Sequence, residues 1–207
     1  MRNSLDDVVA AALRVLELQG LEGCSMRRVA AEAGVQPSAL YHHVPDKQTL
    51  LALMADEIVA GVGAGAGALE GPGDETHAGG VWPEEAERMC GDLRRAMLAV
   101  RDGADVVATA AAFRLGASRV EDDLALLVGR DGARTLLLYT FGQAQATQMH
   151  RHAAAFDALV TDTKGDAGVE GQADRVQRDD HDAAFVRGLK IILAGLTGLM
   201  GDRRPGR

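Results

Sequence analysis

Apolar residues recur every three or four positions along most of this 207-residue chain, and this spacing is the feature that most restricts its fold. Near the start, Leu5, Val9, Ala12, Leu13 and Leu16 carry the pattern. No segment alternates apolar and polar residues for long enough to indicate a β-strand. Hydrophobic residues make up 47% of the chain and aromatic residues only 3%, so a core would consist mainly of alanine, leucine and valine. We therefore expect an all-α fold.

Caps and glycine stops divide the chain into helices. The expected helices span about 5–19, 26–33, 37–43, 46–60, 83–100, 104–114, 118–129, 132–155 and 181–200. Ser25 and Asp46 can cap the second and fourth helices with side-chain oxygens, and Gly20 suits the end of the first. Residues 61–80 are rich in glycine, and residues 157–180 are acidic and poor in large apolar residues. We expect both ranges to be flexible loops.

The charge distribution limits how the chain could meet nucleic acid. The formal net charge is -8, which argues against broad, non-specific binding to phosphates. Residues 1–60 carry a net charge of -3, whereas residues 25–47 carry +1 with two histidines beside them. Any positive potential that could attract DNA phosphates is thus confined to one small surface.

Cys24 and Cys90 stand far apart without metal-ligand spacing, and we expect two reduced, buried thiols rather than a disulfide or a zinc site.

Other classes of protein find little support. No apolar run reaches the roughly 18–20 residues that span a bilayer, and the N-terminus turns acidic at Asp6, so we expect a cytoplasmic protein without a membrane partner. The glycine-rich stretch lacks the preceding strand and the lysine of a phosphate loop, and no catalytic signature occurs. His150 and His152 would point to different sides of a helix and could not chelate one metal ion. We expect no enzyme, cofactor or metal site.

Met26–Pro45 has the spacing of a helix-turn-helix. The motif needs a small residue where the helices touch, a glycine in the turn and an apolar residue on the second helix that faces the core. Ala30, Gly34 and Leu40 meet these needs at offsets of four and six residues. Pro37 is tolerated in the first turn of the second helix. The unit of about 20 residues matches the size of the motif.

A wider set of residues strongly resembles the tetracycline-repressor (TetR) family, and especially its tetracycline-repressor branch. The match covers about residues 4–60 and continues more weakly to the C-terminus. The residues that carry it are Ser25-Met26-Arg27-Arg28-Val29-Ala30, Ala33-Gly34-Val35, Leu40-Tyr41-His42-His43-Val44, Lys47 and Leu50-Leu51, followed by Trp82, Arg101-Asp102-Gly103-Ala104 and Phe185-Val186-Arg187-Gly188-Leu189.

The resemblance implies a helix-turn-helix DNA-binding domain over residues 1–47. Residues 48–207 would then form a helical effector-binding and dimerisation domain, with 46–60 as the connecting helix. The positions that contact DNA in the family fall at Arg27, Pro37, Ser38, Ala39, Tyr41, His42, His43 and Lys47. Arg27 would read a base, and Tyr41, His43 and Lys47 would grip phosphates. The alternatives are a packing aromatic for Tyr41 and a solvated pair for the two histidines.

The same resemblance assigns effector binding and dimerisation to the C-terminal region. Candidate effector contacts, each of which could equally be simple core, are Met89, Leu93, Met97, Val107, Phe113, Phe141 and Gln143. Candidate dimerisation residues, on the long helix and the last one, are Leu137, Phe185, Leu189, Ile192, Leu193 and Leu196. The alternative for the last helix is burial within one subunit.

Tetracycline with magnesium is not the expected effector. By the resemblance, the histidine that holds the metal falls at Val107, and valine cannot ligate magnesium. The drug-binding asparagine falls at Met89, a contacting phenylalanine at Leu93 and a further drug-contacting histidine at Gly63. We expect a more apolar effector.

The sequence therefore predicts a ligand-responsive transcriptional repressor that binds a palindromic operator as a homodimer and is released by a small, apolar effector. The alternative is a small-molecule-sensing or sequestering protein with weak DNA binding. Salt dependence separates the two, because a true DNA binder loses affinity steeply as salt rises.

Overall fold

The computed structural model describes residues 4–63, 82–116, 118–162 and 170–201, and within these ranges the regular structure is entirely helical. This confirms the predicted all-α class. The helices are α1 (Leu5–Gly23), α2 (Met26–Glu32), α3 (Pro37–His43), α4 (Lys47–Ile58), α5 (Trp82–Ala99), α6 (Gly103–Ala112), α7 (Ser118–Asp162) and α8 (Glu170–Gly201).

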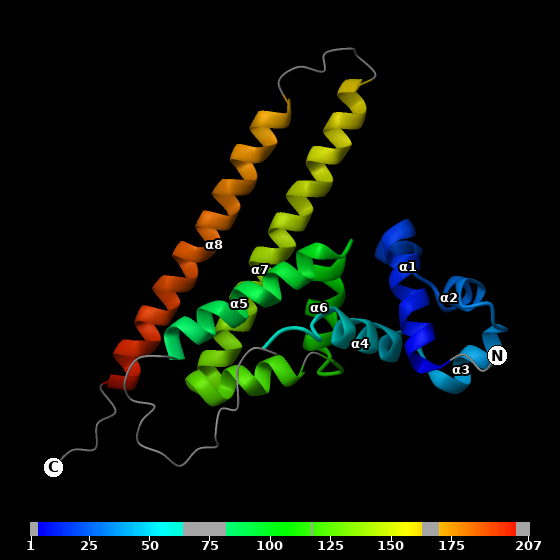
Figure 1. The fold of residues 1–207 in the computed structure, drawn as a ribbon, viewed down its shortest axis with the longest axis horizontal. Coiled ribbons are helices and arrows are strands. Elements are labelled where there is room, and N and C mark those ends of the chain that lie inside the picture. Colours follow the sequence, from blue (N-terminus) through cyan, green and yellow to red (C-terminus); the bar gives the residue numbers. More distant parts are fainter. Residues whose placement is uncertain (1–3, 64–81, 117, 163–169, 202–207) are drawn as a thin grey trace.

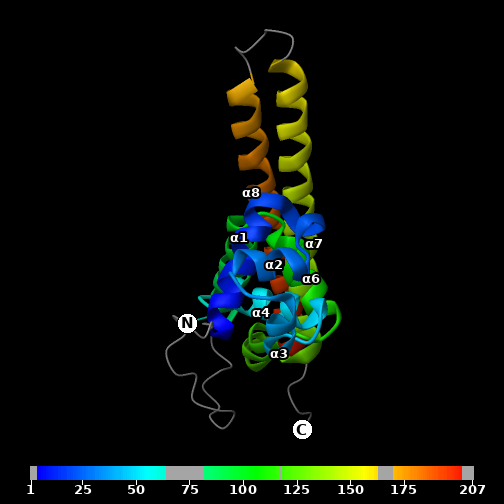
Figure 2. The same cartoon turned by 90° about the vertical axis from the view of Figure 1, so that its right-hand side faces the viewer.

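The first three helices form a small head at one end of the molecule (Figure 1). Its apolar core draws on all three helices and on the turn that follows α3. The fully or almost fully buried side chains of this core are Val8, Ala12, Val15, Leu16, Met26, Val29, Ala30, Leu40 and Val44. In the view from the head, α3 lies low and in front, while α7 and α8 rise behind (Figure 2).

Local rules place the helix boundaries of the head as the sequence predicts. The Ser25 hydroxyl accepts a hydrogen bond from the backbone N–H of Arg28, which caps α2. Asp46 accepts one from the backbone N–H of Thr49 at 2.7 Å and caps α4. This bond lowers the pKa of the Asp46 carboxyl, because it favours the ionised form. Gly20 interrupts α1 with a φ of 70°, and one further turn follows.

The connecting helix α4 joins the head to the larger domain. It packs against α1 on one side and along α6 on the other. Leu50, Met54 and Ala55 are completely buried in these contacts. The apolar core therefore runs without a break from the head into the larger domain. Because α4 contacts both α6 and α1, a movement of α6 would displace α4 and, through it, the head.

The larger domain contains α5 to α8. Gly129, with a φ of 74°, interrupts α7 where the sequence predicts a boundary between two helices. Beyond this break, α7 pairs with α8, and the two form a long helical hairpin that extends past the other helices (Figures 1 and 2).

The predicted loop over 157–180 is wrong in part. Helix α7 continues to Asp162 and α8 begins at Glu170, while 163–169 lie outside the described residues. A lack of large apolar residues means that a segment has no core to bury, but it does not prevent an established helix from continuing through residues with good helix propensity. In the other predicted loop, 61–63 form a turn and 64–80 lie outside the described residues.

Candidate functional site

The helix-turn-helix has the geometry that its sequence spacing predicts. Gly34 adopts a φ of 68° in the turn, a conformation that favours glycine. The backbone N–H of Gly34 donates to the Ala31 carbonyl, and that of Val35 donates to the Ala30 carbonyl at 2.9 Å. Ala30 and Leu40 are completely buried where α2 and α3 meet. The turn therefore holds α3 in a fixed position on the head.

The side chains predicted to contact DNA lie on the outer surface of this unit. Those that are exposed are Arg27, Pro37, Ser38, Tyr41, His42, His43 and Lys47, and Ala39 is half-buried. Tyr41 is 50% exposed, so it is no packing aromatic of the head core. Arg28 donates to the Gly23 carbonyl, whereas the neighbouring Arg27 guanidinium has no partner among the described residues. Arg27 is thus the arginine available to a ligand.

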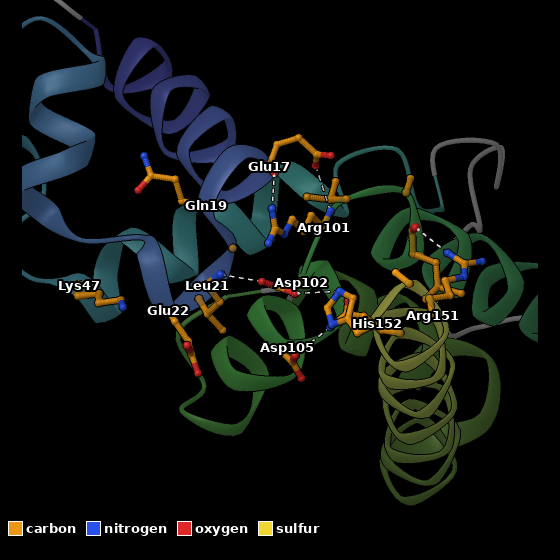
Figure 3. A pocket seen from close by; sticks show the side chains of 16 residues that line it. Glu17, Gln19, Leu21, Glu22, Lys47, Arg101, Asp102, Asp105, Arg151 and His152 are labelled. Atoms are coloured by element: carbon orange, nitrogen blue, oxygen red, sulfur yellow. Dashed lines mark hydrogen bonds and ion pairs between the residues drawn. The ribbon is translucent and has the colours of Figure 1, made fainter. Parts of the chain in front are cut away.

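A cleft of about 1080 Å³ lies between the head and the larger domain, and hydrogen bonds cross it (Figure 3). The Arg101 backbone N–H donates to the Glu17 carboxylate, and its guanidinium donates to the Glu17 carbonyl at 3.1 Å. Asp102 accepts from the backbone N–H of Leu21 at 2.7 Å, and its other oxygen lies 3.5 Å from His152 Nε2. These bonds fasten the end of α1 to the start of α6.

The backbone at this junction is held in an uncommon conformation. Asp102 lies just before α6 with a φ of 55°, in the left-handed region that few residues other than glycine adopt. A Cβ at Gly20 would lie 2.8 Å from the Asp102 carboxylate, and the φ of 70° at Gly20 is one that L side chains rarely adopt, so the position favours glycine. In the first turn of α6, Asp105 accepts hydrogen bonds from the side-chain amides of Gln145 and Gln148. In the sequence, Arg101-Asp102-Gly103 stood out only as a helix break and as part of the family resemblance.

The predicted effector residues separate into a core group and a surface group. Met89, Leu93, Met97 and Val107 are almost completely buried in the apolar core that includes α5 and α6. Phe141 is buried and lines a cavity of about 140 Å³ beside α6 and α7, and Gln143 is half-buried. Phe113 is 57% exposed and follows the last turn of α6 on the surface. The structure thus does not bring all seven residues to one cavity.

A buried arginine that the sequence did not single out connects three helices. Arg94 of α5 is only 8% exposed. Its guanidinium lies 2.6 Å from the Asp182 carboxylate of α8, donates to the Thr147 hydroxyl of α7 and lies over the Phe185 ring. The Nε atom is buried without a partner. The one signal in the sequence was a charged residue on the apolar face of α5.

The predicted dimerisation residues mostly face the interior of the subunit. Leu137, Phe185, Leu189 and Leu193 are buried, and Ile192 and Leu196 are half-buried. This is the arrangement that the alternative of burial within one subunit describes.

Other apolar side chains of the hairpin are exposed instead. They are Leu138 and Met149 on α7 and Val186, Ile191 and Leu199 on α8. A Cβ at Gly142 or Gly195 would meet no atom within 4 Å. We call Leu138, Gly142, Met149, Ile191, Gly195 and Leu199 the open hairpin face.

The parts of the chain that the structure describes hold no group of three histidine, cysteine or acidic side chains that could bind a metal ion. None of the described helices is long and apolar enough to cross a membrane. Both cysteines are buried and unpaired, and burial raises the pKa of the Cys90 thiol to about 11.

Two family models match the chain. Residues 8–54 match the model of bacterial regulatory proteins of the tetR family, and residues 75–200 match the tetracyclin repressor-like C-terminal domain. The second match alone covers more than half of the chain. Family members are regulators.

Two curated relatives illustrate the range of similarity. The HTH-type transcriptional repressor DrrR1 of Streptomyces coeruleorubidus is 53% identical over 55 residues, which are 27% of this chain and 20% of that protein. That match thus spans about a fifth of the relative. The class A tetracycline repressor protein from transposon 1721 of Escherichia coli is 30% identical over 92% of this chain and 88% of that protein.

Two solved structures share the fold over nearly the whole length. BioQ with its double-stranded DNA operator is 25% identical, with a TM-score of 0.67 over 95% of this chain and 99% of the other. ActR of Streptomyces coelicolor in complex with (S)-DNPA is 27% identical, with a TM-score of 0.63 over 96% and 98%. From the helix-turn-helix head, the matched C-terminal domain and these similarities, we conclude that the chain belongs to the TetR family of bacterial regulatory proteins.

Proposed function

We propose that this chain is a transcriptional repressor that binds a palindromic operator as a homodimer and is released by a small effector with a largely apolar body. The observation that carries the proposal is the separation of two unpartnered surfaces. The reading helix α3 is exposed in the head, and the open hairpin face lies on α7 and α8, outside the head. We place the domain boundary between residues 47 and 48, just after the first residue of α4.

DNA binding rests on α3 and the start of α2. Arg27 is free to read a base through its planar guanidinium, and Pro37, Ser38, Ala39 and His42 lie where base edges would be contacted. Tyr41, His43 and Lys47 supply phosphate contacts that set the register. Comparison with BioQ, whose structure was solved with its operator, supports this assignment.

The direct test measures binding to the DNA upstream of the gene for this chain by fluorescence anisotropy. Tyr41→Ala and Lys47→Ala should weaken binding about equally for all sequences, whereas Arg27→Ala should relax preference at one base pair. Arg95→Ala on α5 is the matched control, since it removes an exposed arginine from a helix outside the head. Failure of several effector-free preparations to bind specifically would refute the proposal.

Dimerisation rests on the open hairpin face. Leu138 and Ile191 are 62% and 74% exposed, and the open glycines would let a second helix pair approach closely. Met149→Glu and Ile191→Glu should shift the chain from dimer to monomer in sedimentation, and Met149, 73% exposed, is used because Leu138 also lines a hollow beside α6. Leu126→Glu is the matched control, because Leu126 is also exposed but lies before the Gly129 break. An unchanged dimer in both test variants would exclude this face.

Effector binding would act on the head through α4 and the α1–α6 junction. Gly116, at the corner before α7, fits against the Ala52 backbone of α4, and Asp102 holds the end of α1. An effector regulates only if it binds a state with the wrong head spacing more tightly than the DNA-bound state. Hydrogen exchange in α4 should therefore change when the effector binds.

A second candidate function is sensing or sequestering a small molecule with weak DNA binding. The net charge of -3 over residues 1–60 favours it, because an acidic head attracts DNA poorly. A steep loss of operator affinity with rising salt would support the repressor, and a flat dependence would support the sensor.

A further inference from the structure

Two adjoining hollows open where α6 ends and α7 begins. The charged hollow, which we call the outer one, has a volume of about 420 Å³ and is lined mainly by charged side chains; the apolar hollow beside it, which we call the inner one, has a volume of about 140 Å³ and is lined mainly by apolar side chains, although both hollows are open to the surface. The residues that line both are Ala111, Arg114, Gly116, Glu121 and Arg134. The hollows thus form one amphipathic pocket, which we call the α6–α7 pocket.

The inner end of the α6–α7 pocket has an apolar floor. Ala108 of α6 and Leu137, Leu138 and Phe141 of α7 line it. Arg134 precedes Leu138 by four residues and Phe141 by seven, so the three side chains share one face of α7. An apolar body on this floor would therefore lie beside a guanidinium.

Arg114 occupies a position that helices usually give to glycine. Its φ is 55°, its N–H donates to the Ala111 carbonyl, and the Leu115 N–H donates to the Ala110 carbonyl. This pair of bonds is a Schellman motif, in which the left-handed residue is most often glycine. An arginine in such a strained conformation at the rim of a pocket suggests that its side chain has a use there.

The charges of the α6–α7 pocket are not neutralised by ion pairs. Neither the Arg114 nor the Arg134 guanidinium has a side-chain partner among the described residues. Asp122 and Asp131 line only the outer hollow, whereas at the apolar end the two arginines face a single carboxylate, that of Glu121. The whole pocket is lined by three arginines and three carboxylates, but beside its apolar end the two arginines outnumber the one carboxylate. Guanidinium groups bind carboxylates and similar oxyanions through paired hydrogen bonds.

We propose that the α6–α7 pocket binds an effector that joins an apolar body to an anionic group, with Arg114 and Arg134 holding the anion. The inference rests on the proposed function and sharpens it, because it specifies the charge of the effector. Arg114 lies two residues before Gly116, which fits against the Ala52 backbone of α4. Binding at Arg114 thus acts next to the contact that positions the connecting helix.

The test uses two fluorescent probes with nearly the same apolar body. 1-Anilinonaphthalene-8-sulfonate carries an anionic group, and N-phenyl-1-naphthylamine lacks it. In the full chain, Arg134→Gln and Arg114→Gly should each raise the dissociation constant of the anionic probe about three- to tenfold, and that of the neutral probe less than about twofold. Arg114→Gly suits the left-handed backbone, so it removes the charge without disturbing the helix end. Arg95→Gln lowers the net charge equally on the surface of α5 and is the control.

Three outcomes would overturn the inference. They are no saturable binding of the anionic probe to the unmodified chain, equal losses for both probes, and an equal loss in Arg95→Gln. Operator binding of each variant without probe is measured separately. If the arginines discriminate the probes but the chain binds no operator, the pocket assignment holds and the proposed repressor function fails.

Discussion

Gly116→Ala tests the contact between the α6–α7 corner and the connecting helix. A Cβ at this position would lie 2.7 Å from the Ala52 carbonyl oxygen and 3.1 Å from its Cα. These are backbone atoms of α4, so no side chain can turn aside to make room. Gly116 has no positive φ that would itself forbid alanine. The substitution therefore changes the packing of two helices without straining its own backbone.

The size of the effect follows from this overlap. Ordinary contact begins at 3.4 Å, so α4 and the corner must separate by about 0.7 Å. Overpacking of this kind costs about 1–3 kcal/mol. The loss of glycine freedom in the unfolded chain returns about 0.4–1 kcal/mol. We expect a net loss of roughly 1–2 kcal/mol, which lowers the Tm of a chain of this length by about 2–8 °C.

Two measurements check the prediction. Thermal unfolding reports the stability, and operator anisotropy at fixed salt reports the position of the heads, with an expected loss of affinity of at least about tenfold. Gly91→Ala is the matched control, since Gly91 lies inside α5 with no atom within 4 Å of an added Cβ. That change should stabilise the chain by up to about 1 kcal/mol. If Gly116→Ala has the same Tm and affinity as the control, the corner does not position α4.

Three further predictions concern the head, the hairpin and a buried thiol. Leu40→Ala should cost about 2–5 kcal/mol in the free energy of unfolding, because Leu40 is completely buried; a loss below about 1 kcal/mol in denaturant titration would contradict this. Gly188→Ala should lower the Tm, because its Cβ would overlap the Tyr139 hydroxyl, and adding Tyr139→Phe should restore part of the loss; strictly additive effects would disprove that contact. Because burial raises the pKa of Cys90 to about 11, its thiol should react with Ellman's reagent at pH 8 only after unfolding, and the free energy of unfolding should fall as pH rises from about 9 towards 11; rapid labelling of the folded chain would show that Cys90 is accessible.

Features that depend on neighbours in the sequence were predictable. Ser25 and Asp46 cap helices through bonds to residues three positions away, and Gly34 makes its turn within one helical unit. Such interactions need no knowledge of the rest of the fold, so composition and spacing suffice. The exposure of Tyr41 follows equally from the helical spacing, which directs Leu40 towards the core.

Features that depend on distant contacts were not predictable. Arg94 meets Thr147 across 53 positions, and Asp102 meets Leu21 across 81. Neither pairing leaves a local pattern. Helix α8 shows the same limit, because its apolar residues form two faces. The periodicity identified only the Phe185 face, and the packing of α5 and α7 decides that this face is covered and the Ile191 face is open.

Residues 25–47 carry a net charge of only +1, so electrostatic attraction to DNA is weak. In the proposed repressor, operator binding therefore depends on the contacts that position the head, those of Gly116 with α4 and of Asp102 with α1. The head together with the connecting helix, residues 1–60, has a net charge of -3 and holds DNA poorly by itself, so occupancy of an operator depends on two heads that bind together. Simultaneous binding is lost when the spacing of the heads no longer matches the grooves. A small displacement of α4, caused at Gly116 or at Asp102, then removes the contribution of a whole head rather than of one contact. A strongly basic head would stay bound through phosphate contacts alone, so an acidic head makes the operator complex more sensitive to the effector.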